Sequence, residues 1–454
     1  MSLVVGVPLG LLISRTDLWL RNVFSILYFL PVLIPAYIHA IVWTHMDRIL
    51  KKFFLFDIHT IWGAILVLTL AYFPFVTLMT VAGLKSIDRN LEEASLTCYG
   101  RITTLGRITL PLAVPHILSG AIFVFIFSII DVGVPDILRV KVYPLEIFIQ
   151  FSAFYNESAA AILSMPLIGL TFMLIALQKL YMKGRSYVQI QGSEKNPLCY
   201  SLGRCHPFAI LFCLFTVCLS AILPVMVLFI VAGSLSNYVK VMSTSIHQIA
   251  YSFVLAFLGA AVTVVLGFGI AYLIERSKNI AKIPLSWAVF IPLAIPATTL
   301  GIGFIGIWNR VIMDIVYASS VILVLGYVAR FVPYGTIIMI SGMKQINPRM
   351  EEAAVQSGTR WARVMGRIVA PLSKHSLMVA FFIVFILAFG ELGTTLLIIP
   401  PGRETIPIKI YNLMHYGADQ SVAALCLIII NLIICMSGIF LLLRRYISIS
   451  NRIK

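Results

Sequence analysis

Long apolar runs separated by short polar stretches make up most of this chain. A helix needs about 20 consecutive apolar residues to cross the hydrocarbon core of a bilayer. One run, residues 1–13, is too short, because it ends before Arg15. Ten further runs are long enough or nearly so, at residues 23–45, 59–82, 112–132, 158–180, 208–233, 248–274, 284–308, 315–340, 376–398 and 420–443. The pattern predicts an all-α polytopic membrane protein with about ten full spans and a shortened first one.

The composition supports a membrane protein. Hydrophobic residues make up 60% of the chain and charged residues only 11%, whereas a soluble globular protein carries about 25% charged residues. This excludes a soluble enzyme, a nucleic-acid-binding domain and a disordered tail. The net charge of +16 is better explained by basic cytoplasmic loops than by nucleic acid. We therefore expect a lipid membrane, and no nucleic acid, around this chain.

The charged residues gather on one side of the predicted spans. The loops on that side hold 24 of the 34 basic residues and eight of the 18 acidic ones, and they lie at residues 14–22, 83–116, 179–207, 275–284, 341–375 and 444–454. The rest of the chain is neutral, with ten residues of each sign. By the positive-inside rule the charged side is cytoplasmic, and the C-terminus lies there too.

The chain contains an internal repeat with an offset of about 260 residues. The stretch from Gly83 returns at Gly342, and Leu91-Glu92-Glu93-Ala94 returns as Met350-Glu351-Glu352-Ala353. The second repeat has six spans, an even number. Both repeated loops therefore face the same side, which makes the repeats parallel about a pseudo-two-fold axis along the membrane normal.

The first repeat is shorter than the second. Gly6 to Arg15 aligns with Gly267 to Arg276, and nothing in the first repeat matches residues 208–261. We expect either a late start site or a true truncation, with about 60 residues encoded upstream in the first case; a genuine design with eleven spans is the third alternative. The expected division of the chain is a first repeat at 1–180, a cytoplasmic linker at 181–207 and a second repeat at 208–454.

The repeated cytoplasmic loop has the signals of a short capped helix. Asn347 is a good N-cap and Pro348 fits the first helical position. Glu351 and Glu352 follow near the first turn, where the helix dipole favours acids, and Gly358 can end the helix in a left-handed conformation. We expect a short helix, a glycine turn and a second helix that leads into the next span. The first repeat offers the corresponding residues Asp88, Glu92, Glu93 and Gly100.

This loop resembles the EAA loop of binding-protein-dependent ABC importer permeases. The second repeat reads Glu-Ala-Ala from Glu352, three residues, Gly358, nine residues, and Ile368-x-Ala370-Pro371. It departs from the family pattern only in Ala370, which replaces leucine. The first repeat reads Glu-Ala-Ser and is one residue shorter. Two loops fused in one chain resemble the iron(III)-type permeases, a group that includes thiamine and phosphonate relatives.

The resemblance implies partners on both sides of a bacterial inner membrane. Two ATP-binding-cassette subunits would dock on the cytoplasmic loops, and a solute-binding protein would deliver solute from outside. The resemblance gives the ATPase-coupling role to Glu92, Glu93, Gly100, Glu351, Glu352 and Gly358. The chain has no Gly-Lys dipeptide and so no P-loop, which means that ATP hydrolysis is expected in a separate subunit. We expect no enzymatic activity, cofactor or resident metal in this chain.

Two pairs of prolines interrupt corresponding spans. They are Pro31 with Pro35 and Pro292 with Pro296. Proline kinks a helix, and irregular backbone at membrane depth survives only where protein or a water-filled cavity covers it. We interpret the prolines as candidates for the solute pathway or, alternatively, as routine span prolines.

Three charged residues lie in or near the spans. Arg330 lies in mid-span, where an ionisable residue indicates function or an ion pair. Asp131 and Glu391 occupy equivalent positions near the outer ends of their spans. They are interpreted as pathway residues, as partners of Arg330, or as interfacial acids in water.

The sequence favours the permease subunit of an ATP-driven importer that works by alternating access. One alternative is an ion-coupled secondary transporter with parallel repeats, using Arg330, Asp131 or Glu391. Another is a non-functional truncated permease. The residues themselves do not identify the solute, and iron(III) is favoured only by the resemblance.

Overall fold

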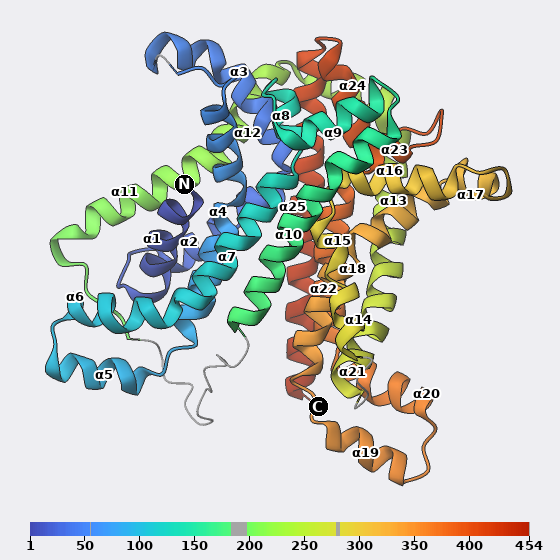
Figure 1. Cartoon of the computed structure of the whole chain (residues 1–454). Helices are drawn as coiled ribbons and strands as arrows, with labels where there is room; N and C mark the ends of the chain where they lie inside the picture. The colour runs from blue at the N-terminus through green and yellow to red at the C-terminus, as the bar shows by residue number, and fades with distance from the viewer. Residues whose placement is uncertain (55, 183–197, 278–281, 454) are drawn as a thin grey trace. The chain divides into compact units, whose positions relative to one another are not determined.

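A computed structural model describes the chain except for residues 55, 183–197, 278–281 and 454 (Figure 1). The chain forms two compact units. Unit 1 comprises residues 1–146 and 168–231, and unit 2 comprises residues 147–167 and 232–454. Most of the expected linker at 181–207 lies outside the described residues. In the part of the chain that is described, extended backbone pairs only at an isolated bridge between Thr16 and Tyr200.

The helices of the first half of the chain follow one another with short connections. Among the described elements of the whole chain, η2, η4 and η6 are π-helical, and η1, η3 and η5 are 3-10 helices. In chain order they are α1 (Ser2–Arg15), α2 (Arg21–Leu27), η1 (Leu30–Leu33), α3 (Ala36–Phe54), α4 (Ile61–Lys85), α5 (Arg89–Cys98), α6 (Arg101–Thr104), η2 (Leu105–Thr109), α7 (Leu110–Ile130), α8 (Gly133–Ile137), α9 (Tyr143–Ser152) and α10 (Glu157–Met182).

The helices that follow residue 197 include two much longer than the thickness of a bilayer, α13 and α25. In chain order they are η3 (Gly203–Cys205), α11 (His206–Val217), η4 (Cys218–Ile222), α12 (Leu223–Ala232), α13 (Leu235–Arg276), α14 (Lys282–Ala288), α15 (Ile291–Ala294), α16 (Ala297–Trp308), η5 (Val311–Met313), α17 (Asp314–Tyr317), α18 (Val321–Met343), α19 (Pro348–Gln356), α20 (Trp361–Val364), η6 (Met365–Val369), α21 (Ala370–Leu372), α22 (Lys374–Phe389), α23 (Thr395–Ile398), α24 (Ile406–His415) and α25 (Asp419–Ile453).

The predicted spans are confirmed as helices. Among the described residues, seven helices are long and apolar enough to cross a membrane, and the number rises to ten if each of three bent helix pairs counts as one span. The stub at the N-terminus is the apolar helix α1, with 14 residues. Each of the ten predicted apolar runs overlaps one of these spans or bent pairs.

Two of the bent pairs fall at the predicted proline interruptions. The first repeat bends by 89° and the second by 108°. In each case the residue before the second proline is extended, with ψ of 113° at Ile34 and 124° at Ile295. Proline disfavours the α conformation in the residue that precedes it, so Pro35 and Pro296 place each break. The interruption of these spans was predicted correctly; a pathway role stays a prediction.

The third bent pair distinguishes the two repeats. In the second repeat the helix bends by 74° at Ser373, between Leu372 and Lys374, so the span begins after Pro371 rather than at it. In the first repeat residues 101–130 form one continuous helix of 30 residues. Both repeats nevertheless carry a π-helical turn at the equivalent place, in η2 and η6.

Small residues bring the core helices of each unit together. In unit 1 a Cβ added at Gly6 would lie 2.7 Å from Val76 Cβ, across the α1–α4 interface. In unit 2 a Cβ added at Gly267 would lie 3.1 Å from the backbone of Gly335 and Thr336, across the α13–α18 interface. Glycine at these aligned positions allows close helix packing in a membrane. Each unit thus builds its loop on a tightly packed helix pair.

The core of unit 1 includes a helix from beyond the linker. Leu9 and Ile13 of α1 share a buried cluster with Ala209, Cys213 and Val217 of α11. The sequence repeat begins its second copy at residue 208, yet residues 208–231 are part of unit 1.

Candidate coupling site

Both loop helices begin as the sequence predicts. In the first repeat the side chain of Asp88 accepts a hydrogen bond from the Asn90 N–H at 2.9 Å. In the second repeat Asn347 accepts from the Arg349 N–H at 3.1 Å, and Pro348 occupies the first turn of α19. Such caps satisfy backbone donors that have no partner within the helix. The loop helices α5 and α19 are therefore defined by equivalent N-caps.

The two loop helices end differently. Gly358 has a φ of 81°, and its N–H donates to the Val355 carbonyl at 2.9 Å, so the predicted left-handed end of α19 is confirmed. Gly100 does not play this part in the first repeat, and that expectation was wrong. The chain leaves α5 in extended conformation at Tyr99, and Gly100, with a φ of −71°, begins α6 instead. The missing residue in this loop removes the glycine turn.

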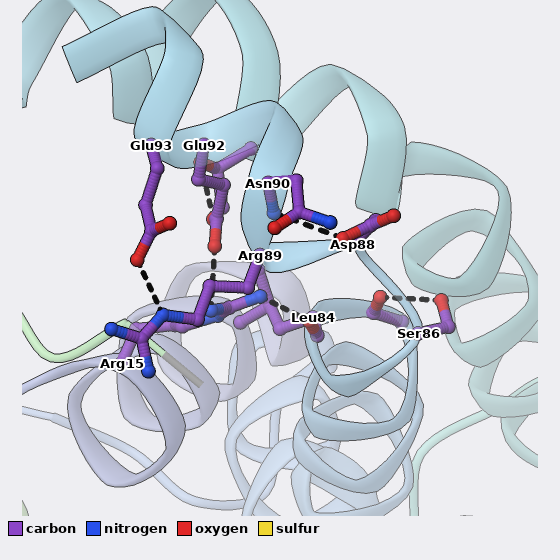
Figure 2. Close-up of polar contacts among 10 residues, drawn as sticks. Arg15, Leu84, Ser86, Asp88, Arg89, Asn90, Glu92 and Glu93 are labelled. Atoms are coloured by element: carbon purple, nitrogen blue, oxygen red, sulfur yellow. Dashed lines mark hydrogen bonds and ion pairs between the residues drawn. The ribbon is translucent and has the colours of Figure 1, made fainter. Parts of the chain in front are cut away.

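A buried ion pair fixes the first loop helix to the ends of the short helix α1 and of the span α4. The Arg15 guanidinium lies 2.7 Å from the Glu92 carboxylate, and the exposed fractions of these side chains are 1% and 0%. Arg15 also donates to the Leu84 carbonyl near the end of α4, and the Thr109 hydroxyl donates to Glu92 at 2.8 Å. Figure 2 shows the Glu92 carboxylate directed at Arg15, with Leu84 on the other side of the guanidinium. Arg15 therefore joins α1, α4 and α5.

The second loop helix is fixed by an equivalent ion pair. Arg276 Nε lies 2.8 Å from Glu351 Oε1, and the exposed fractions of these side chains are 14% and 9%. The same guanidinium donates to the carbonyls of Met343 at 3.3 Å and Ile346 at 2.9 Å. Arg276 is the last residue of α13 and Met343 the last of α18. The arginine thus joins α13, the end of α18 and α19.

These arginines are functional candidates that the sequence reasoning missed. Arg15 and Arg276 occupy the ends of the two stretches that the repeat aligns, and Glu92 and Glu351 align as well. The signal in the sequence was an arginine at the end of both aligned stretches, although most other residues of these stretches differ. The sequence alone does not show which glutamate pairs with Arg15. Glu92 and Glu93 are equally good candidates until the rotation of the loop helix about its axis is known.

The two acids of each loop face different surroundings. Glu92 and Glu351 are buried, whereas Glu93 is half-exposed and pairs with Arg89 of its own helix at 2.6 Å. Glu352 is exposed on α19. Figure 2 shows Glu93 reaching the Arg89 side chain while Glu92 reaches Arg15. The geometry leaves only the second acid of each loop available to a partner protein.

The Glu92 carboxyl lies in a dry environment. Burial raises the pKa of Glu92 above its ordinary value, and the Arg15 guanidinium and the Thr109 hydroxyl oppose that rise. Removing charge from water is costly unless the partner geometry compensates. The pair is therefore sensitive to the loss of either member.

The structure gives Arg330 a partner. Arg330 Nε lies 2.9 Å from Glu391 Oε2, and both side chains are largely buried, with exposed fractions of 20% and 7%. Asp131, the other candidate partner, instead accepts a hydrogen bond from the Tyr72 hydroxyl at 3.0 Å. Of the alternatives that the sequence left open, the pairing of Arg330 with Glu391 is the one observed.

The aligned acids near the outer ends of the spans share a backbone role. Asp131 Oδ1 accepts from the Val134 N–H at 2.8 Å, and Glu391 Oε1 accepts from the Thr394 N–H at 2.7 Å. Each acid therefore holds the turn that leads into a short helix, α8 or α23. Their equivalence extends beyond sequence position to the same hydrogen bond.

Two repeats of membrane-spanning helices, each with a capped loop helix fixed to the ends of its spans, define a polytopic membrane protein of the transport class. Residues 6–187 and 263–449 match the family described as binding-protein-dependent transport system inner membrane component. The chain belongs to this family. It is the permease component of an ABC importer and a multi-pass inner membrane protein.

Similar proteins cover most of the chain at low identity. The Fe(3+)-transport system permease protein FbpB 2 of Haemophilus influenzae is 22% identical over 429 residues, which is 93% of this chain and 82% of that protein. The ferric transport system permease protein FbpB of Actinobacillus pleuropneumoniae is 24% identical over 92% of this chain and 65% of its own length. The molybdate/tungstate transport system permease protein WtpB of Pyrococcus abyssi is 28% identical over 41% of this chain.

The family decides between the alternatives drawn from the sequence. An importer permease is favoured over an ion-coupled secondary transporter, since both matched regions belong to binding-protein-dependent systems. The similar proteins are transport permeases rather than enzymes.

Proposed function

We propose that this chain moves its solute inward when two separate ATPase subunits close against its loop helices α5 and α19. One observation carries the proposal: each repeat presents a capped helix that is tied by an arginine–glutamate pair to the ends of two packed apolar helices. A push on such a helix is passed to the spans rather than absorbed by a loose loop. Alternation between outward-open and inward-open states then follows from a bias applied at the loops.

The proposal places both loops and the C-terminus in the cytoplasm and a solute-binding protein on the outer side. The excess of basic residues on the loop side supports this orientation. Figure 1 shows α5 with α6 at one end of unit 1, and α19 with α20 at one end of unit 2. Within each unit the coupling helix therefore projects from a single end.

Iron(III) is the solute that we propose. The support is that two ferric permeases align with 92–93% of this chain. Arg330 does not argue for an anionic solute, because its charge is balanced by Glu391 at 2.9 Å. The aligned prolines at the breaks of the two spans remain the pathway candidates in this proposal.

Reconstitution tests the function directly. The chain is purified with its ATPase and placed in liposomes with its binding protein and a radioactive solute. ATP-dependent uptake of iron(III), and no uptake with a non-hydrolysable ATP analogue, is the expected result. Molybdate and spermidine serve as competing solutes. Failure of the ATPase to co-purify, or uptake driven by an ion gradient without ATP, would overturn the proposal.

A further inference from the structure

The two arginine–glutamate pairs are the same device built twice. Arg15 and Arg276 each end the first core helix of their unit, and each contacts the aligned glutamate and the aligned carbonyl of Leu84 or Met343. The repeats differ at most other positions, including the partner of their outer acids. The agreement in three helices and in two contacts therefore contrasts with the divergence of the surrounding residues.

Stability alone does not explain buried pairs of this kind. Taking two charges out of water can cost more than their attraction returns, and a hydrophobic replacement is often as stable. The carbonyls of Leu84 and Met343 lie at helix ends, where each accepts a turn hydrogen bond from the N–H of Ile87 or Ile346. A carbonyl oxygen has two lone pairs, so each can also accept from the arginine. A guanidinium with several donors in a fixed plane can hold a carboxylate and such carbonyls together. The arrangement fixes geometry among three helices.

We infer that Arg15 and Arg276 are positioning residues that make each coupling helix rigid with the ends of its spans. The inference rests on the proposed function and assigns different roles to the two adjacent glutamates of each loop. Glu92 and Glu351 act inside the protein as the arginines' partners. Glu93 and Glu352 remain on the outer surface of the loop.

The two joints differ in stiffness. The first is nearly inaccessible to solvent, and Thr109 adds a hydrogen bond to Glu92 at 2.8 Å. The Tyr200 N–H also donates to the Arg15 carbonyl at 2.7 Å. In the second repeat the residue aligned with Thr109 is Val369, which has no side-chain donor. Glu351 instead has Tyr272 of α13 as a hydrogen-bond partner, and Arg276 is its ion-pair partner. Because the second joint is less buried than the first, it is the better place for a test.

The experiment uses the assembled complex with ATPase and binding protein in liposomes. Arg276→Met should lower solute uptake at least tenfold while the ATPase still co-purifies and hydrolyses ATP, so that more ATP is consumed per solute moved. Arg276→Lys should transport little better than Arg276→Met, because a single ammonium cannot bind the carboxylate and the carbonyls as the planar guanidinium does. The exchange of charges in Arg276→Glu with Glu351→Arg should recover part of the coupling. Arg363→Met, at an exposed arginine of the same loop, is the matched control.

A distance measurement covers the case in which Arg276→Met assembles poorly. Spin labels at Leu273 on α13 and Val355 on α19, both exposed, should keep one narrow distance with and without ATP in the otherwise unchanged complex. Replacing Glu351 with Gln should broaden that distribution. A wild-type complex without ATP-driven uptake would defeat the proposed function itself. A working wild type whose label distance changes with ATP, or an Arg276→Met complex with normal uptake per ATP, would defeat only the positioning role.

Discussion

The carboxylate of Glu391 lies 2.9 Å from Arg330 Nε, whereas the aligned carboxylate of Asp131 accepts its bond from the Tyr72 hydroxyl. Ala71 aligns with Arg330 in the first repeat, and Tyr72 follows it directly. Two acids at equivalent places therefore meet a cation in one repeat and a neutral hydroxyl in the other. The arginine compensates an acid that the rest of unit 2 leaves buried.

Replacing Arg330 with Met should destabilise unit 2 rather than block the pathway. The change leaves the Glu391 charge buried without its cation, at a cost of about 3 kcal/mol. Thermal unfolding in detergent should occur at a lower temperature, and less protein should reach the membrane. Adding Glu391→Gln should restore much of the loss. Normal assembly of the single variant with abolished uptake would instead place Arg330 in the pathway.

Reversing the outer acids should uncouple ATP hydrolysis from transport. Glu352→Lys is expected to abolish uptake while membrane insertion stays normal, since its exposed side chain lies on the loop surface that we propose contacts the ATPase. Glu93→Lys should have a milder effect, because Glu93 is engaged by Arg89 and its loop departs from the family spacing. Uptake and ATPase rates measured on the same preparations decide this. Normal transport in the double variant would contradict the role of the loops.

Gly358→Ala should weaken the second loop, and Gly100→Ala should not affect the first. Both glycines face open space, so neither new methyl group meets a neighbour. The difference is backbone conformation, since Gly358 has a φ of 81° and Gly100 one of −71°. A left-handed alanine costs about 1 kcal/mol. Protease sensitivity of the loop should rise only in the Gly358 variant; equal sensitivity in both variants would show that the glycine turn is unimportant.

Gly267→Leu should separate α13 from α18 and unfold unit 2 more easily. Even a Cβ at this position lies 3.1 Å from backbone atoms of Gly335 and Thr336, which cannot move aside like a side chain. Overpacking of this kind costs about 1–3 kcal/mol or more. Gly269→Leu provides the matched control, because a Cβ there meets nothing within 4 Å. Similar unfolding temperatures for both variants would argue against close packing at Gly267.

Local features of this fold were predictable because they depend on neighbouring residues. The apolar length of each span, the caps at Asp88 and Asn347, and the breaks before Pro35 and Pro296 follow from hydropathy, side-chain capping and proline sterics. The internal repeat also predicted that the two cytoplasmic loops have the same structure and role, because the same motif occurs in both copies.

Partner choice across helices was not predictable in the same way. Arg15 pairs with Glu92, and Arg330 pairs with Glu391. Both choices depend on how the helices are rotated about their axes and on which side chains are buried together. Tyr99 is extended because the first loop is one residue shorter than the second. How the chain turns at this deletion depends on the position of the helix that follows. A single sequence carries no measure of these tertiary constraints.

The position of α11 in the core of unit 1 has a consequence for how the polypeptide is held together. Ala209, Cys213 and Val217 come after the linker, yet they pack with Leu9 and Ile13 from the beginning of the chain. A chain severed within residues 183–197 would leave this contact intact. Two fragments covering residues 1–182 and 198–454, made separately in one cell, should therefore purify together. In that case the packing of α11 against α1 holds the two fragments together without a peptide bond between them.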